Sequence, residues 1–307
     1  MLVSMKSYIG DAVMTIPLLE QIDSAVPEMV VQTSGAVRFV LEGICAPEQI
    51  APSFQGRSPF KVIAAARALK AQRFDAVILV NHSFRSALIV RLAGIPRRIG
   101  HSSEGRDFLL TDAQQCDEKE FESFSIAALA APLGLTPVRQ RPLLHVSDQE
   151  RTRGVELLHG ATIGFQPGAR HAYRTTPIDK VAAIARSLQA DGHKLVMVGG
   201  KEEVEIAAKV EGQLQEPVVN LVGKTSIRET IGCLASLRAC FGNDTGVMHL
   251  SAASGCPTVQ IFGSYKVDKW GHAYPPHRVL KAPDDDLTRV DEEEVVEAVL
   301  QAARGRD

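Results

Sequence analysis

No apolar run in this 307-residue sequence reaches about 18 residues, the length that a transmembrane helix needs, so no membrane-spanning helix is expected. The N-terminal stretch MLVSMKSYIGD lacks the apolar core of a secretory signal peptide, and it predicts a short strand that enters a loop. The five cysteines are odd in number and include no CxxC spacing, which argues against a disulfide framework. Cys233, Cys240 and Cys256 lie among apolar residues, so we expect core thiols in a reducing cytoplasm.

Several common site motifs are also missing. The nine histidines form no HExxH motif and no His/Cys grouping with metal-ligand spacing, so no metal site is expected. The tripeptide GKT at 223–225 is not a P-loop, because that motif needs a glycine where Val218 stands. No GxGxxG follows the first predicted strand, which disfavours a nicotinamide oxidoreductase. The net charge of −2 gives no basic field that would indicate a nucleic-acid partner.

Strand-like and helix-like runs alternate along the whole chain. LVSM (2–5), MVVQT (29–33) and AVILVN (76–81) predict buried strands in the first half, and a helix is expected at 119–133. Such alternation is typical of parallel sheets with helices on both faces. The Pro-rich segment PLGLTPVRQRPLL predicts a linker, so we expect two Rossmann-like domains, 1–140 and 141–307, with a cleft between them. The C-terminal helix is a candidate to pack back on the first domain.

Two stretches allow more than one local structure. LLHVSD (143–148) is compatible with a strand, and DQERTRGVELL with a helix that is capped near Ser147 or Asp148. TTPIDKVAAIARSLQADG predicts a helix with Thr176 as N-cap, Pro177 in the first turn and Gly192 as its stop.

Ligands of open parallel sheets bind outside the carboxyl ends of the strands, so the loops at those ends are the candidate sites. In SYIGDAVMTIP (7–17), Asp11 has two compatible interpretations. As a helix N-cap it needs no further function, whereas as a carboxylate at the end of a strand it could act as a general base. Pro17 leaves the helix start open, either near Thr15 or at Asp11 with a kink.

Three loops in the second half suit an anionic or nucleotide ligand. In FQPGARHAYRTTP (165–177), Gly168 lets a ligand approach the backbone, and Arg170, His171 and Arg174 precede a helix N-terminus. VGGKEEVEIA (198–207) offers the Gly199 turn and two carboxylates, which serve either the helix dipole or a ribose diol. Lys224 and Thr225 of LVGKTSIRE are further candidates to line a ligand.

The corner GNDTGVMH (242–249) carries the strongest local signal. Asp244 or Thr245 can cap the following helix, and Gly246 lets an anion reach backbone N–H groups that would cradle a diphosphate. His249 follows Thr245 by four residues, so it lies on the same helix face. Taken alone, His249 indicates a hydrogen-bonded core histidine.

The segment 83–106 is rich in arginine. It contains five arginines and only one acidic residue, Glu104, a composition that suits either a solvated surface or an anionic partner. No aromatic residues interleave them in the manner of single-strand nucleic-acid sites. The arginines are Arg85, Arg91, Arg97, Arg98 and Arg106.

Taken together, these loops resemble glycosyltransferase family 9, the ADP-heptose:lipopolysaccharide heptosyltransferases. The matching motifs run in order from about residue 2 to 265, and the last of them is the most specific. NHSFRSALIVRLAGIPRRIG is further similar to the branch that adds the second core heptose. The motifs are GDAVMTIPLL, QPGAR with Arg174 and Pro177, VGGKEE, LVGKTSIRE and NDTGVMHLSAASGCPTVQIFG.

The resemblance implies a GT-B fold and an inverting, metal-independent transfer of heptose from ADP-heptose to the lipopolysaccharide inner core, with no cofactor. Asp11 matches the family's general base, and Glu203, or alternatively Glu202, matches the residue that holds the ribose. The partners implied are the nucleotide-sugar and an anionic glycolipid of the lipid A/Kdo-core type, with peripheral contact at the cytoplasmic face of the inner membrane. The donor-binding residues implied or suggested are Gly168, Arg174, Gly199, Glu203, Lys224, Asp244, Thr245, Gly246 and His249, and those for the acceptor are Ser83, Arg85 and Arg98.

One motif departs from the family pattern. Arg174 is followed by Thr175, Thr176 and Pro177, where the family has a basic residue followed directly by Trp-Pro. Arginine keeps the charge and adds bidentate phosphate geometry, but the missing tryptophan puts the identity of the donor in question. The alternatives are a family 9 transferase with another nucleotide-sugar or acceptor, and a catalytically silent nucleotide-binding protein of the same fold.

Overall fold

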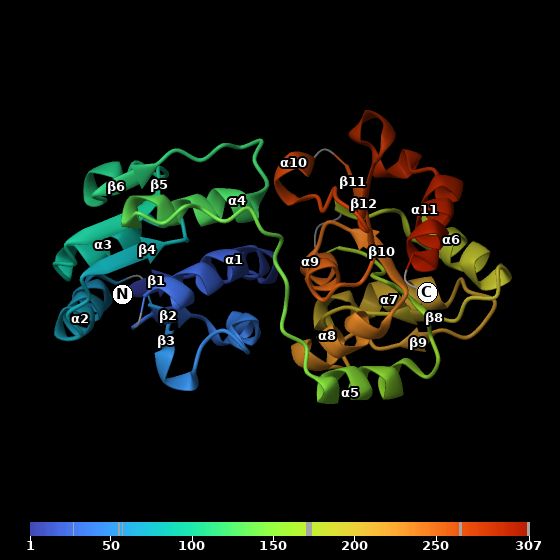
Figure 1. Ribbon diagram of the computed structural model, residues 1–307. Helices are drawn as coiled ribbons and strands as arrows, with labels where there is room; N and C mark the ends of the chain where they lie inside the picture. Colours follow the sequence, from blue (N-terminus) through green and yellow to red (C-terminus); the bar gives the residue numbers. More distant parts are fainter. Residues whose placement is uncertain (27, 55, 57, 170–173, 264–265, 306–307) are drawn as a thin grey trace. The chain divides into compact units, whose positions relative to one another are not determined.

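The computed structural model describes residues 1–307 except 27, 55, 57, 170–173, 264–265 and 306–307 (Figure 1). Contacts between residues divide the chain into two units, Met1–Pro142 and Leu143–Asp307. The linker predicted from sequence spans this division. Each unit has its own six-stranded sheet.

The first unit alternates strands and helices from its first residues. Its sheet contains parallel strands only, in the order β3-β2-β1-β4-β5-β6. The strands are β1 (Leu2–Ser4), β2 (Val30–Thr33), β3 (Ile50–Pro52), β4 (Ala76–Leu79), β5 (Arg97–His101) and β6 (Asp112–Gln114). The α-helices are α1 (Ile9–Ala25), α2 (Pro59–Ala71), α3 (Phe84–Leu92) and α4 (Glu122–Ala127), with 3₁₀ turns η1 (Gly35–Leu41), η2 (Pro47–Gln49), η3 (Asp107–Leu109) and η4 (Ala128–Leu133).

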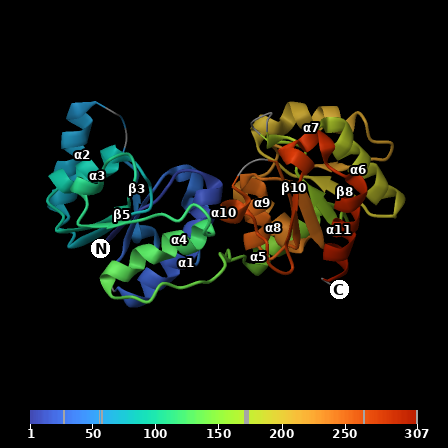
Figure 2. The same cartoon turned by 90° about the horizontal axis from the view of Figure 1, so that it is seen from above.

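Helices cover both faces of this sheet. α1 packs with α4 on one face, and α2 packs with α3 on the other, as Figure 2 shows. Leu2 and Leu79 of the central strands are fully buried against Ala66 and Ile89 of α2 and α3. The chain order of the strands reverses between β1 and β4, which makes the carboxyl ends of these two strands the topological switch point.

The second unit repeats this topology. Its parallel strands follow the order β12-β11-β10-β7-β8-β9, so its switch point lies between β7 and β10. The strands are β7 (Ile163–Phe165), β8 (Leu195–Met197), β9 (Val219–Asn220), β10 (Ala239–Asn243), β11 (Thr258–Phe262) and β12 (Arg278–Lys281). The α-helices are α5 (Asp148–Leu158), α6 (Ile178–Ala190), α7 (Val204–Glu211), α8 (Ile227–Ser236), α9 (Gly246–Ala253), α10 (Val267–Trp270) and α11 (Glu292–Arg304), with 3₁₀ turns η6 (Lys201–Glu203), η7 (Pro283–Asp285) and η8 (Leu287–Arg289).

The core of the second unit lies mainly between its sheet and α6, α7 and α11. The rings of Phe165 and Phe241 stack at 5.4 Å within it. Helix α11 packs on α6, β10 and β11, and its residues Val295 and Val299 are buried in this core. The expected packing of this last helix on the first domain stays a prediction.

On the other face of this sheet, α5 and α8 pack at very close range. A Cβ atom on Gly232 would overlap the carbonyl oxygen of Glu150, and one on Gly154 would overlap the backbone of Gly232. Glycine at both positions therefore allows two helix backbones to touch. Arg228 of α8 also binds both carboxylate oxygens of Glu150, at 2.5 and 2.6 Å.

The segment between the units contains no helix or strand from residue 135 to 147. On one side, the guanidinium of Arg141 stacks over the ring of Phe121 at 4.9 Å. On the other side, the backbone N–H of Leu144 donates to the carbonyl of Ala253. Both ends of the linker are therefore held by the unit to which they belong.

Several sequence-based expectations need correction. LLHVSD forms no strand, and α5 begins after Ser147, which shares a capping box with Glu150. Helix α6 has Pro177 as its N-cap instead of Thr176, which is fully buried. The helix expected at 119–133 is a short α-helix followed by the 3₁₀ turn η4. Strands β3, β5, β6 and β12 were not predicted.

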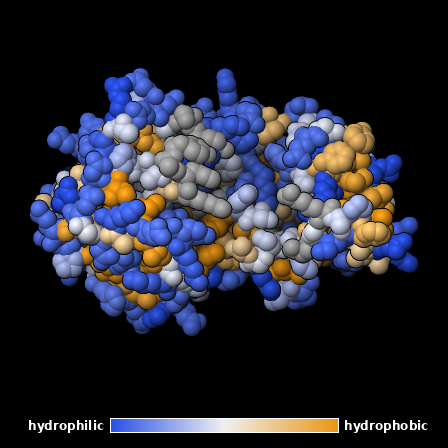
Figure 3. All heavy atoms as spheres, turned by 180° about the vertical axis from the view of Figure 1, so that it is seen from behind, coloured by the Kyte–Doolittle hydropathy of each residue, from blue (hydrophilic) through white to orange (hydrophobic). Residues whose placement is uncertain are grey.

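Among the described residues, no helix is both long enough and apolar enough to cross a membrane. Hydrophilic side chains cover much of the face in Figure 3, and orange apolar side chains appear between them on both halves of the view.

Candidate functional site

The switch point of the first unit gathers three charged side chains. The ammonium group of Lys6, just past β1, lies 2.8 Å from Asp11 Oδ1 and 2.6 Å from Glu122 Oε1. Glu122 of α4 is almost fully buried, whereas the side chains of Lys6 and Asp11 stay 16% and 15% exposed. Burial by itself would lower the pKa of Lys6, but the two carboxylates outweigh it and raise that pKa.

Asp11 is not the N-cap of α1. The helix begins at Ile9 with Tyr8 as N-cap, so Asp11 lies in the first turn and its carboxylate is bound by Lys6. α1 continues through Pro17 to Ala25, and neither predicted start was correct. The second carboxylate oxygen, Oδ2, accepts no hydrogen bond from the described residues.

A neutral histidine lies near this cluster. Burial, with the nearby charge of Lys6 and the ring of His101, lowers the pKa of His82 to about 4. The rings of His82 and His101 meet edge to face at 5.4 Å. Both imidazoles are therefore uncharged at neutral pH, because burial also lowers the pKa of His101.

In the second unit, the corner after β10 is fixed by Asn243. Its side chain accepts from the backbone N–H of Thr176 at 2.9 Å and donates to the hydroxyl of the same residue at 2.9 Å. It also donates to the carbonyl of Ile261 on β11. Asn243 thus ties the ends of β10 and β11 to the start of α6, and this is why Thr176 is buried.

Asp244 stands at the centre of a chain of polar side chains. Its Oδ2 lies 3.6 Å from the guanidinium of Arg174, and its Oδ1 lies 3.3 Å from His249 Nε2. The other ring nitrogen of His249 contacts His272 at 2.9 Å, and His272 contacts the hydroxyl of Tyr274 at 2.8 Å. His249 therefore fits both interpretations of the sequence. It is a buried, hydrogen-bonded histidine, and it contacts Asp244 of the candidate ligand-binding corner.

Three donor groups at this corner have no partner in the described part of the chain. The N–H groups of Gly246 and Val247 open α9, where a helix has no acceptor of its own to offer. The hydroxyl of Thr245 is buried and likewise forms no hydrogen bond. Unsatisfied buried polar groups such as the Thr245 hydroxyl are rare in proteins, so this corner, beside Arg174, is the candidate anion site.

The remaining donor-site candidates lie on the neighbouring loops of the same sheet. A Cβ on Gly168 would press against Ile206 of α7, and one on Gly199 would lie 3.4 Å from the carboxylate of Glu203. Glu203 Oε2 accepts the N–H of Gly200 at 2.6 Å, and burial raises the pKa of Glu203 despite that hydrogen bond. Lys224 donates to the carbonyl of Asn220. Arg170 and His171 lie outside the described residues.

The acceptor-site candidates are engaged within their own unit. The guanidinium of Arg98 is buried and donates to the carbonyls of Ile95, Pro96 and Leu109. Arg85 donates to the carbonyls of Phe54 and Gly56, and Ser83 caps α3. A role of these residues in acceptor binding stays a prediction.

Arg106 contradicts the expectation of a solvated or ligand-facing arginine. It is fully buried, and it donates to the carbonyls of Asn81, Ser83 and His101. Burial lowers its pKa to about 10, so it stays charged at neutral pH.

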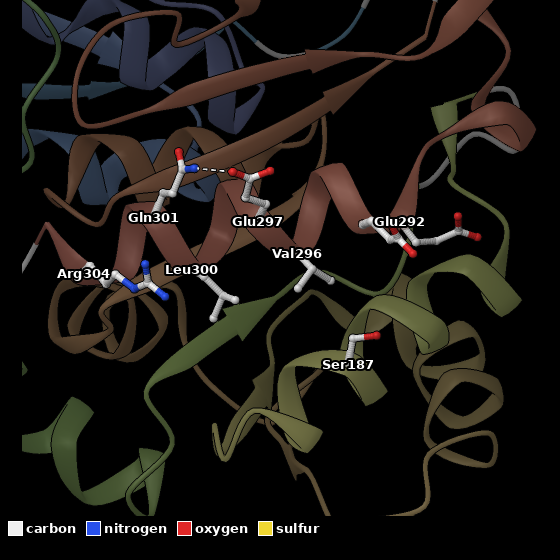
Figure 4. Close-up of a pocket in the computed structure, with 8 residues that line it drawn as sticks. Ser187, Glu292, Val296, Glu297, Leu300, Gln301 and Arg304 are labelled. Carbon is white, nitrogen blue, oxygen red and sulfur yellow. Dashed lines mark hydrogen bonds between the residues drawn. The ribbon is translucent and has the colours of Figure 1, made fainter.

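A separate cavity of about 490 Å³ lies between α6 and α11 of the second unit (Figure 4). Three glutamates line it, so it suits an anionic ligand poorly. The described residues contain no group of three or more His, Cys, Asp or Glu side chains that could hold a metal ion. The residues that line the cavity are Ser187, Glu292, Glu293, Val296, Glu297, Leu300, Gln301 and Arg304.

Comparison with known proteins assigns the chain to a family. Residues 62–296, more than half of the chain, match the model of "Glycosyltransferase family 9 (heptosyltransferase)". The lipopolysaccharide heptosyltransferase 2 of Escherichia coli K12 is 26% identical over 285 residues, which cover 85% of this chain and 82% of the relative.

Two solved structures share the fold. The E. coli ADP-heptose lipopolysaccharide heptosyltransferase II superposes with a TM-score of 0.84 at 24% identity, covering 99% of this chain and 98% of that one. An E. coli heptosyltransferase solved with ADP superposes with a TM-score of 0.74 at 17% identity, covering 98% of this chain and 99% of that one. With its two parallel sheets, the chain has the GT-B architecture. The protein belongs to glycosyltransferase family 9, the heptosyltransferase family, and is a glycosyltransferase.

Proposed function

We propose that this enzyme transfers a heptose from ADP-heptose to the inner core of a lipopolysaccharide acceptor. The relatives named above carry this activity in their names. The observation that carries the proposal is the group of unpartnered donors at Thr245, Gly246 and Val247, next to Arg174. The corner offers a positive charge and hydrogen-bond donors, and those three donors have no acceptor among the described residues. A diphosphate accepts several hydrogen bonds and carries negative charge, so it would complete this corner.

The donor half of the reaction rests on charge stabilisation. When the bond between the sugar carbon C1 and the phosphate oxygen breaks, ADP leaves with the electron pair. The guanidinium of Arg174 and the N–H groups at the start of α9 would stabilise the negative charge that develops. Asp244 and His249 would hold Arg174 in place, because Asp244 contacts both.

The acceptor half rests on Asp11. Lys6 holds its Oδ1, and Oδ2 would take the proton of the acceptor hydroxyl as the oxygen of that group bonds to C1. A single displacement of this kind inverts the configuration at C1. Asp11 and the Asp244 corner belong to different units, and the cleft between them stays a prediction.

We further propose that the reaction needs neither a metal ion nor a cofactor. The cationic and N–H groups of the donor corner would perform the charge stabilisation that Mg²⁺ provides in other nucleotide enzymes. Full activity after exhaustive treatment with EDTA would support this. Loss of activity that added Mg²⁺ restores would contradict it.

The acceptor would be an anionic glycolipid of the lipid A/Kdo-core type, reached at the cytoplasmic face of the membrane. The test is a transfer assay with purified protein, ADP-heptose and core acceptors that carry no heptose or one heptose. We expect transfer to the one-heptose acceptor, with inversion at C1 seen by NMR. Transfer from another nucleotide-sugar alone would reassign the donor, and ADP binding without any transfer would indicate a silent binding protein.

A further inference from the structure

Helix α2 of the first unit is apolar on its outward side as well as on its buried side. Ala66 and Leu69 face the core and are about 5% exposed or less. On the opposite side, Phe60 is 84% exposed and Ile63 is 45% exposed, and they are followed at helical spacing by Arg67. A helix on the surface of a globular domain normally presents polar residues there, so this side is suited to a partner.

The neighbouring elements carry further exposed apolar side chains. α3 packs beside α2, as both ribbon views show, and it carries the exposed side chains of Phe84 and Leu92 (Figures 1 and 2). Phe108 of η3 is 74% exposed, and its ring lies 6.0 Å from that of Phe84. These five side chains are the majority of the large apolar residues that the described structure exposes. The surface is called the α2–α3 face and consists of Phe60, Ile63, Arg67, Phe84, Leu92 and Phe108.

The charges on both helices have one sign. α2 and α3 contain five basic residues and no acidic one. None of the five forms an ion pair within the described structure, and Arg85 donates to backbone carbonyls. Two carboxylates border the face at its η3 end: Glu104 accepts the N–H of Phe84, and Asp107 accepts a serine hydroxyl. The four basic residues besides Arg85 are Lys61, Arg67, Lys70 and Arg91.

We propose that the α2–α3 face docks on the surface of an anionic phospholipid bilayer. Exposed aromatic side chains insert at the boundary of headgroups and acyl chains, and lysine and arginine beside them bind the lipid phosphates. A protein partner would have to place carboxylates at fixed positions opposite these basic residues. The phosphates of a bilayer can move to meet basic residues at any spacing, so the bilayer fits this face better. This inference rests on the proposed function, because a glycolipid acceptor is presented in such a membrane.

The test measures flotation of the full-length protein with vesicles of phosphatidylethanolamine and phosphatidylglycerol, against vesicles of phosphatidylcholine alone. We expect binding to the anionic vesicles only, and weaker binding as salt screens the charges. Replacement of Phe60 and Phe108 by serine should weaken binding about tenfold for each ring, the factor that about 1.4 kcal/mol corresponds to. Arg67→Gln and Lys70→Gln should each weaken it about fivefold, corresponding to about 1 kcal/mol.

Matched controls carry the same changes on the second unit. Val155→Ser removes an exposed aliphatic residue from α5, and Lys209→Gln removes an exposed charge from α7. Neither should change vesicle binding. All variants should transfer heptose normally to a water-soluble, delipidated core acceptor, because none lies at Asp11 or Asp244.

Two outcomes would overturn the docking proposal. One is vesicle binding that is absent, or that is equally strong for the serine and control variants. The other is an oligomer, detected by light scattering, that binds no vesicles and that the Phe60→Ser variant converts to a monomer. The face would then be an interface between copies of this chain. Failure of the proposed function would look different, because soluble-acceptor transfer would be absent while vesicle binding persisted.

Discussion

At the scale of single residues, Asp11 depends on a partner five positions earlier in the chain. Lys6 follows β1 directly, and Asp11 lies in the first turn of α1, so the short loop between them brings the two charges together. The ammonium ion binds one carboxylate oxygen, and the other accepts no hydrogen bond from the described residues. Lys6 itself is fixed from the far side by Glu122.

Replacement of Asp11 by asparagine keeps the shape of the side chain and removes its ability to take a proton. We expect kcat to fall by about 10² to 10⁴, the usual contribution of general acid–base catalysis, with the Kd for ADP unchanged. Steady-state transfer kinetics and calorimetric titration with ADP measure the two effects. Asp23→Asn, an exposed change on the same helix, is the control. Near-normal turnover of the Asp11 variant would remove Asp11 from the mechanism.

The hydroxyl of Thr245 gives a second prediction at this scale. Because this hydroxyl is buried without a partner, Thr245→Val should leave the melting temperature of the ligand-free protein unchanged or slightly higher. The Kd for ADP should rise about tenfold, since a hydrogen bond to a charged phosphate contributes about 1.5–3 kcal/mol. Thermal shift with and without ADP separates these effects, with Thr152→Val as control. A loss of stability without ADP, at constant affinity, would show that the hydroxyl has a structural role.

At the scale of secondary-structure elements, the contact between α5 and α8 is the most sensitive in the second unit. Gly232→Ala would drive a methyl group into the backbone of α5 at Glu150, so the helices would have to separate. We expect a loss of about 3 kcal/mol in the free energy of unfolding, at the upper end for overpacking. Gly212→Ala at the end of α7 is the control, and it should stabilise by about 0.5 kcal/mol. Urea unfolding of both variants measures the difference, and equal stability would mean that the helices readjust freely.

The elements that the sequence predicted are those with a dense apolar pattern. β1, β4, β10 and β11 are runs of buried side chains, and their burial follows from composition alone. β5 was missed because its sequence is RRIGH, and nothing local indicates that Arg98 buries its guanidinium on backbone carbonyls. β6 is a polar strand at the sheet edge and carries no signal of its own.

The candidate site divides in the same way. Asp11, Asp244 and His249 stand in short motifs whose residue types already suggest their chemistry. Lys6 and Glu122 were missed because they meet only in space, 116 positions apart. His272 was missed for the same reason, since its contact with His249 depends on how α10 and the following loop return to the sheet.

At the scale of the whole molecule, acid should destabilise the protein before its carboxylates titrate. His82 has a pKa of about 4 in the folded chain, against an ordinary value of 6.5, so the unfolded state binds more protons in between. The contribution of His82 to stability is therefore complete above pH 6.5 and is lost as the pH falls through about 4. His101 acts in the same direction.

We expect the melting temperature to fall between pH 6.5 and pH 4, and to fall less steeply in His82→Asn. Differential scanning fluorimetry across this range measures both slopes. His159→Asn, an exposed change at a left-handed position that asparagine tolerates, should keep the slope of the parent protein. If the melting temperature of the His82 variant fell with pH as steeply as that of the parent protein, the acid sensitivity would belong to other groups.

The anchored linker limits how the two units can turn about each other. Arg141 is held by Phe121 and Leu144 by Ala253, so the residues without such an anchor are Pro142 and Leu143. Proline fixes its own φ, which leaves few soft torsions at this hinge. The soft torsions between the two anchors are therefore concentrated in these two residues instead of being spread along a long flexible segment. An insertion of glycines at this point would add soft torsions to the chain between the two units.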